Sequence, residues 1–155
     1  MISLKYNMNV TKIRGEVIME MNECINFLLT KAQHTVFQYL KSELAQYDVT
    51  PVQYGILKCL WDEDSQTPKQ IATVLILDSS TITGIIERMV NKGLVVRIAS
   101  IEDRRTLNVE LTNDGFLLRE PIEQIIEDVN KKVLINFSSE EQNQLKLRLK
   151  QIINN

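Results

Sequence analysis

The segment from Asp78 to Leu111 constrains the fold most, because its hydrophobic periodicity changes in the middle. Before Gly93, apolar side chains recur every three or four residues, the spacing of an amphipathic helix: Ile82, Ile85, Ile86, Met89 and Val90. After Gly93, residues 94–98 (Leu-Val-Val-Arg-Ile) have the composition of a strand, and residues 107–111 alternate between apolar and polar side chains. This order predicts a helix capped by Asp78 and closed by Gly93, followed by two strands that pair as a hairpin.

The polar face of this helix differs from an ordinary solvent-exposed face. It carries small and hydroxyl side chains together with a few longer ones: Ser80, Gly84, Glu87 and Asn91, flanked by Thr81, Thr83 and Arg88. Ser, Thr and Gly are weak helix formers, and a glycine inside a helix costs about 1 kcal/mol relative to alanine. Small side chains allow another surface to approach closely, and the free N–H groups of the first turn suit phosphate groups.

Two more helices are predicted from one repeated start signal, Thr-Pro followed by Gln three residues after the Thr, at residues 50–53 and 67–70. The first of these helices is expected to bury apolar residues up to an acidic loop at 62–65. The second is short and is expected to end near Leu77. A short helix, a turn, a second helix and a hairpin form the layout of a winged helix-turn-helix.

Long apolar stripes occur on both sides of this region. We expect a first helix over about 20–45, a helix from Thr112 to Phe137 that Pro121 either kinks or truly starts, and a last helix whose apolar side chains point inward: Leu145, Leu149, Ile152 and Ile153. These stripes present more apolar surface than a small winged domain needs for its own core. We therefore expect a homodimer that forms through the terminal helices. The predicted divisions are a tail at 1–19, helical dimerisation segments at 20–48 and 113–155, and a DNA-binding region at 49–112.

Composition excludes several other classes. The 155 residues are 44% hydrophobic and 25% charged with a net charge of −2, which fits one globular domain. No apolar run is long enough for a membrane span and no signal peptide is recognised, so we expect a cytoplasmic protein without membrane contact. A single histidine and two isolated cysteines give a metal site nothing to build from, and we expect no cofactor. No P-loop, nucleophile elbow or dinucleotide-binding turn is found, which makes an enzyme the weakest interpretation.

The middle of the chain, residues 66–106, is the only block that is net basic, with six Lys/Arg against four Asp/Glu. Four of these charges fall in the predicted connection between the strands: Glu102, Asp103, Arg104 and Arg105. Paired arginines on a long tip suit the minor groove or the backbone of DNA.

The chain resembles the MarR family of bacterial transcription regulators over about residues 20–153. The residues that carry the resemblance are Leu77-Asp78-Ser79-Ser80-Thr81-Ile82-Thr83, Arg88-Met89, Lys92-Gly93-Leu94-Val95, Arg97, Asp103-Arg104-Arg105 and Leu111-Thr112-Asn113-Asp114-Gly115. The resemblance implies a mainly α fold with a small β-hairpin, with a winged helix-turn-helix between long terminal dimerisation helices. It also implies a homodimer that binds a pseudo-palindromic operator in double-stranded DNA and is released by a small molecule or an oxidant.

Site residues follow from the same resemblance. Ser79, Ser80, Thr81 and Thr83 are expected at the major groove, and Lys69 and Arg88 at phosphates. Arg105 is expected in the minor groove, oriented by Asp103. Ser79 and Thr81 have an alternative role, which is to cap the helix itself. Arg104 could instead be a solvated residue of the tip. Arg97 has either a structural or a phosphate-binding role.

The expected trigger is a small molecule, with phenolic or aromatic acids as the leading class. The resemblance suggests a crevice lined by His34, Tyr39, Tyr54 and Trp61, although aromatic residues at helical spacing are more often core. A branch of the family senses organic peroxides through a cysteine directly before Phe-Leu-Leu, but here Asn26 precedes Phe27 and Cys24 lies two positions earlier. Cys24 is therefore a candidate for oxidant sensing whose alternative is a small buried hydrophobe, and Cys59 is expected to be structural.

A function outside DNA binding is also open at this stage. A winged domain can serve as a protein-interaction module, and fold alone does not exclude that role. The paired arginines of the tip and the Ser/Thr face favour DNA, because a module that only binds protein needs neither.

Overall fold

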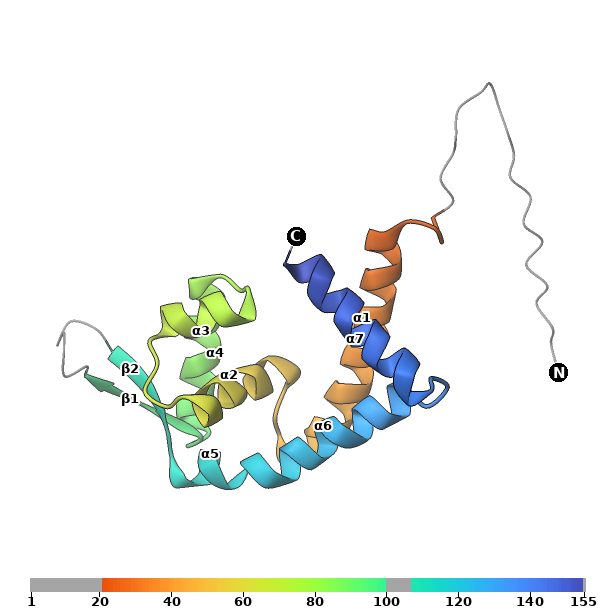
Figure 1. The fold of residues 1–155 in the computed structure, drawn as a ribbon. Coiled ribbons are helices and arrows are strands. Elements are labelled where there is room, and N and C mark those ends of the chain that lie inside the picture. Colours follow the sequence, from red (N-terminus) through yellow and green to blue (C-terminus); the bar gives the residue numbers. More distant parts are fainter. Residues whose placement is uncertain (1–20, 100–106, 155) are drawn as a thin grey trace. The chain divides into compact units, whose positions relative to one another are not determined.

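The computed structural model describes residues 21–99 and 107–154, and it is mostly helical with one two-stranded antiparallel sheet (Figure 1). By internal contacts the chain divides into two units, Met1–Thr35 and Val36–Asn155. Helix α1 (Ile25–Leu44) begins in the first unit and ends in the second, followed by a 3₁₀ turn at Ala45–Tyr47. The predicted tail at 1–19 lies outside the described residues. Within those residues no helix is long and apolar enough to cross a membrane.

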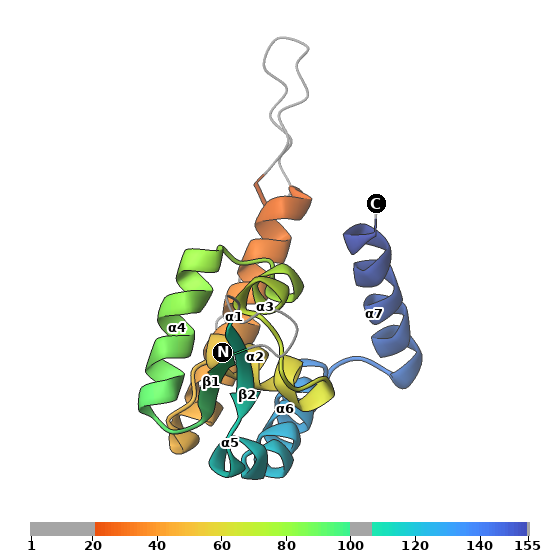
Figure 2. The same ribbon diagram turned by 90° about the vertical axis from the view of Figure 1, so that its left-hand side faces the viewer.

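The winged helix-turn-helix is confirmed. Helices α2 (Pro51–Asp62), α3 (Pro68–Leu75) and α4 (Ser79–Asn91) precede strands β1 (Val95–Ala99) and β2 (Leu107–Leu111). Figure 2 shows α4 beside the hairpin, with α2 and α3 packed behind the strands. Both predicted start signals form complete capping boxes, in which the Thr50 and Thr67 hydroxyls accept from the N–H groups of Gln53 and Gln70.

The hairpin pairs Val95 with Leu111 at its base and Ala99 with Leu107 toward its tip. A third segment joins it through Gln66, which exchanges two backbone hydrogen bonds with Val109, at 3.2 and 2.8 Å. The loop between α2 and α3 is thereby attached to the second strand of the wing. The predicted tip residues Glu102, Asp103, Arg104 and Arg105 lie outside the described residues.

One hydrophobic core holds the winged region together. It is built by α2, α3, α4, both strands and the start of α6, and its completely enclosed side chains are Leu44, Ile56, Leu57, Leu60, Ile71, Ile82, Ile86, Met89, Val95, Val109 and Ile122. All the predicted inward residues of α4 except Val90 are buried, and Val90 is half-buried. Gly93 follows α4 with φ 71°, a conformation that favours glycine.

The single helix predicted from Thr112 is in fact two. Helix α5 (Asn113–Leu117) ends at Leu118, and α6 (Arg119–Val133) starts there, so that Pro121 lies in the first turn of α6, where its missing N–H costs nothing. Gly115 in α5 packs so closely on β1 that a Cβ at this position would overlap the carbonyl oxygen of Leu94. This close approach explains the glycine.

The terminal helices differ from the prediction in one respect. No residue of α7 (Ser139–Ile153) is buried, and Leu145, Leu149, Ile152 and Ile153, predicted to face inward, are exposed. Helix α1 buries only Leu44, and Ile25, Leu28 and Leu29 are exposed. The inward assignment of the α7 residues is therefore wrong for the described part of the chain, where these side chains are exposed.

Candidate nucleic-acid interface

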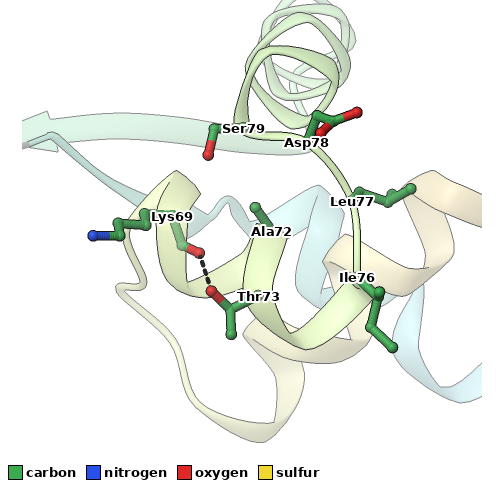
Figure 3. A pocket seen from close by; sticks show the side chains of 7 residues that line it. All are labelled: Lys69, Ala72, Thr73, Ile76, Leu77, Asp78 and Ser79. Carbon is green, nitrogen blue, oxygen red and sulfur yellow. Dashed lines mark hydrogen bonds between the residues drawn. The ribbon is translucent and has the colours of Figure 1, made fainter.

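A groove of about 530 Å³ lies between α3 and the start of α4. Figure 3 shows Lys69 and Ser79 at one side of it and the turn residues Ile76 and Leu77 at the other. The Thr73 hydroxyl, also in the groove, donates to the Lys69 carbonyl at 3.0 Å. The helix-turn-helix thus presents an ammonium group and the first turn of α4 along one open surface.

The first turn of α4 lacks the side-chain cap that four other helices have. Thr50, Thr67, Thr112 and Ser138 each accept a hydrogen bond from a first-turn N–H, whereas the Asp78 side chain makes none. The first N–H groups of a helix have no partner within the helix, so those of α4 point outward together with the Ser79, Ser80 and Thr81 hydroxyls. Such a helix end favours an anion through its N–H groups and its dipole.

Hydrogen bonds within the interface restrict what two of its residues can do. The Thr83 hydroxyl donates to the Ser79 carbonyl at 2.7 Å, so its proton is used inside the helix and its methyl group and oxygen lone pairs remain available. The Arg97 guanidinium donates to the Thr83 carbonyl at 3.2 Å, which brings β1 against α4. Arg97 therefore has a structural contact, although the residue is exposed.

Gly84 and Arg88 occupy the middle of the outward face. A Cβ on Gly84 would meet only Nη1 of Arg88, at 3.9 Å, so the Arg88 side chain lies back across the glycine. The glycine is not required by packing inside the chain. Because glycine has no side chain, the helix backbone is accessible at this position. Another molecule can therefore approach this face of α4 closely.

The turn between α3 and α4 contains a strained residue. Ile76 has a left-handed backbone, φ 53° and ψ 48°, although it is β-branched, and its side chain is 87% exposed. Such a conformation costs of order 1 to 3 kcal/mol and normally favours glycine or asparagine. Neither the strained backbone nor the exposed apolar side chain of Ile76 stabilises the fold. Both features therefore suggest that this turn has a role at the surface.

All predicted DNA-contacting residues within the described part of the chain are exposed on one region: Lys69 on α3, Ser79, Ser80, Thr81, Thr83 and Arg88 on α4, and Arg97 on β1. Among the described residues Lys69, Arg88 and Arg97 form no ion pair. Three exposed cations that pair with no acid of the described ranges favour an anionic partner. Asp103, Arg104 and Arg105 lie outside the described residues.

Sequence reasoning missed the role of Lys92, which it noted only as part of the family pattern. The Lys92 ammonium pairs with the Asp48 carboxylate at 2.9 Å and also reaches the Asp48 carbonyl, joining the end of α4 to the segment before α2. No sequence signal reveals this pair, because its members are far apart in the chain.

The four proposed effector residues differ in burial and in the contacts that they make. Trp61 is buried, and its Nε1 donates to the Gly115 carbonyl at 3.1 Å, so it belongs to the core. Tyr54 is half-buried, its ring centroid 6.4 Å from that of Trp61, and burial raises the pKa of its hydroxyl. Tyr39 is exposed beneath the Lys132 ammonium, which lies 4.6 Å from its ring centroid. His34 is exposed on α1.

The two cysteines are free and differ in accessibility. Cys59 is buried, and the resulting desolvation raises the pKa of its thiol, as expected for a structural cysteine. Cys24 is half-buried directly before α1, and its carbonyl accepts from the Leu28 N–H at 3.0 Å. Within the described part of the chain Cys24 is thus less buried than its interpretation as a small buried hydrophobe implies.

Comparison with known proteins matches residues 49–107 to the MarR family. A relative from Bacillus subtilis, an organic hydroperoxide resistance transcriptional regulator, is 35% identical over 66% of this chain and 69% of its own length. The homoprotocatechuate degradative operon repressor of Escherichia coli is 26% identical over 86% of this chain and 90% of its own. A crystal structure of mutant MarR from Escherichia coli with operator DNA is 27% identical, covers 85% of this chain and 96% of that one, and has a TM-score of 0.78.

Proposed function

Because this chain belongs to the MarR family of transcription regulators, we propose that it is a repressor that binds a pseudo-palindromic operator as a homodimer. The observation that carries the proposal is the outward face of α4, where small and hydroxyl side chains lie between three cations without an ion pair among the described residues. In this proposal Ser79, Ser80, Thr81 and Thr83 face the major groove.

Phosphate contacts come from Lys69, Arg88 and the first-turn N–H groups of α4, with Arg97 beside them. Arg105, supported by Asp103 and Arg104, enters the minor groove from the wing. The solved relative bound to operator DNA supports this docking by its similarity to the present chain.

The test is binding of the purified protein to DNA from upstream of its own gene, measured by fluorescence anisotropy at several salt concentrations against a scrambled duplex. We expect specific binding that weakens steeply as salt rises, because counter-ions return to the phosphates. Equal affinity for both duplexes, or a flat salt response, would contradict the proposal and favour a protein-interaction module.

The dimer in this proposal uses the exposed apolar side chains of α7 and α1. Leu145, Leu149 and Ile152 recur at helical spacing on α7, and exposing such a stripe to water is unfavourable at roughly 25 cal/mol per Å². We expect light scattering to give twice the chain mass. Leu145→Lys with Leu149→Lys should yield monomers, whereas Gln144→Lys with Gln151→Lys adds the same charge elsewhere on the helix and should leave the dimer intact.

A small-molecule effector is expected to release the operator. The homoprotocatechuate repressor is named for an operon that degrades an aromatic acid, so phenolic and aromatic acids are the first class to test. Their addition should lower operator affinity without changing the dimer mass.

A second candidate trigger is oxidation of Cys24. Two observations favour it: the relative from Bacillus subtilis is named for organic hydroperoxide resistance, and Cys24 is only half-buried. An organic hydroperoxide should then release the operator, a thiol reductant should restore binding, and Cys24→Ser should abolish the response while Cys59→Ala keeps it. Release that persists in Cys24→Ser would exclude this trigger.

A further inference from the structure

A pocket of about 430 Å³ opens between α2 and α3, apart from the groove of the nucleic-acid interface. It is lined by residues of both helices and of the loop that joins them: Tyr54, Gly55, Lys58, Cys59, Asp62, Glu63, Gln66, Val74 and Leu75. Its volume falls in the range of sites that bind small organic molecules.

The walls of the pocket are largely apolar. The Tyr54 ring and Leu75 are half-buried, and Val74 at the α3 side is 64% exposed, so its apolar surface remains in water. Gly55 permits the close approach of the two helices here, because a Cβ on it would lie 3.0 Å from a methyl carbon of Leu75. An apolar molecular body would remove this surface from water.

The side chains that line the pocket carry a net negative charge. Lys58 is the only cation among the lining residues, and its ammonium is already paired with the carboxylates of Asp62 at 2.7 Å and Glu123 at 3.4 Å. Glu63 forms no ion pair with any described residue. An aromatic acid entering here would meet the uncompensated charge of Glu63 and a lysine that is already neutralised by Asp62 and Glu123, whereas a cation would be attracted to Glu63.

We propose that this pocket binds lipophilic organic cations, such as amines or quaternary ammonium compounds with a compact apolar body. The body lies against Tyr54, Leu75 and Val74, and the cationic group lies at the Glu63 carboxylate, beside the Lys58–Asp62 ion pair. The Tyr54 ring adds a face that attracts a cation. Aromatic acids, if they act on this protein, bind elsewhere.

Occupancy of this pocket has a regulatory consequence, which rests on the proposed function. Helix α3 carries Lys69 and leads through Ile76 into α4, and its Leu75 side chain lies directly against Gly55 of α2 at the edge of the pocket. A molecule inserted between the helices shifts α3 relative to α2 and hence moves Lys69 and the start of α4. The bound cation therefore lowers operator affinity.

The test uses para-tert-butylbenzyltrimethylammonium and its acidic counterpart para-tert-butylphenylacetate with the full chain. Trp61 is the only tryptophan of the sequence and lies next to Tyr54, so its fluorescence reports on the pocket, and calorimetry gives an independent affinity. We expect the cation to bind at least about fivefold more tightly than the acid at low salt, with a smaller ratio at high salt. Equal or tighter binding of the acid, or binding of neither, would overturn the proposal.

Two double variants locate the site. Asp62→Asn with Glu63→Gln should remove the preference for the cation, since it deletes the rim carboxylates and frees Lys58. Glu127→Gln with Asp128→Asn makes the same charge change on α6, where both acids also neighbour a lysine, and should keep the preference. A preference unchanged in the first variant would place the cation elsewhere and contradict the proposal.

Neither measurement involves DNA, so a failure of the proposed function leaves cation binding testable. If the cation binds but operator affinity is unchanged, only the regulatory consequence is lost.

Discussion

Arg97 on β1 donates a hydrogen bond from Nη2 to the backbone carbonyl of Thr83 on α4, at 3.2 Å. The contact links the wing to the helix that presents the Ser/Thr face, across elements that are separated by the turn at Gly93. The Arg97 residue as a whole is exposed. Arg97 thus adds one side-chain contact between the wing and α4 and places its positive charge beside this helix.

Arg97→Ala is expected to weaken operator binding by about 1 to 3 kcal/mol, because both a positive charge and the contact with α4 are lost. Arg97→Lys keeps the charge but lacks the planar fork, so its loss should be intermediate. Anisotropy titrations of the three proteins provide the check, with thermal unfolding as the control for folding. Full affinity in Arg97→Ala would exclude the residue from the interface.

Lys69→Ala is expected to weaken binding to specific and scrambled DNA by similar factors, because a phosphate contact carries no sequence information. The slope of log affinity against log salt should decrease by about 0.9 for one lost contact. Lys150→Ala, which removes an exposed lysine of α7, is the matched control and should keep the slope. A larger loss for the specific duplex would instead assign Lys69 to base recognition.

Gly84→Ala is expected to separate stability from function. The new methyl group meets nothing closer than Arg88, so the melting temperature should rise with a gain of up to about 1 kcal/mol in the free energy of unfolding. Operator affinity should fall, since the methyl group lies on the face that approaches DNA. Higher stability with unchanged affinity would mean that α4 docks at some distance from Gly84.

Gly115→Ala is expected to destabilise the protein by about 1 to 3 kcal/mol or more, because a Cβ there overlaps the Leu94 carbonyl and the backbone of α5 or β1 must move. Denaturant unfolding followed by circular dichroism measures the change. Asp114→Ala, on the neighbouring exposed position, serves as the comparison and should cost far less.

The thiol of Cys59 is expected to stay unreactive toward a thiol reagent at neutral pH, since burial protects it and raises its pKa. In Cys24→Ser, which keeps only Cys59, the reagent should therefore label no thiol in the folded protein and one thiol in denaturant. Because the pKa of this thiol is higher in the folded protein than in the unfolded chain, the free energy of unfolding is highest at a pH where the thiol is protonated in both states. This contribution is lost as the pH rises above the ordinary thiol pKa, because the unfolded chain then loses its proton first.

Local signals predicted the winged region well. The Thr-Pro starts of α2 and α3, the stripe of α4 and the alternation of β2 depend on neighbours within a few residues, and each element forms as expected. The kink or start expected at Pro121 occurs as a break at Leu118, slightly earlier in the chain. The left-handed Ile76 was not foreseen, because this residue type carries no distinctive turn chemistry. Tertiary pairs such as Arg97 with Thr83, and the acidic pocket between α2 and α3, depend on the packing of separate elements, which periodicity does not encode.

The error in α7 has a different cause. Periodicity identifies an apolar stripe but does not tell whether the same chain or another one covers it, so Leu145 and Leu149 were assigned to an interior that one chain does not provide. The wing residues Asp103, Arg104 and Arg105 remain predictions from the sequence pattern.

The pairing of Gln66 with Val109 connects the loop after α2 to the centre of β2 by two backbone hydrogen bonds, and the buried Gln66 side chain adds bonds to the Cys59 and Glu63 carbonyls. Opening the base of the hairpin therefore requires breaking the end of α2 as well. The amide protons of Gln66 and Val109 should exchange with solvent together, and only as slowly as the helix-turn-helix itself unfolds. The wing and the three helices then behave as one cooperative unit, so the hairpin cannot melt without loss of the surface that α4 presents.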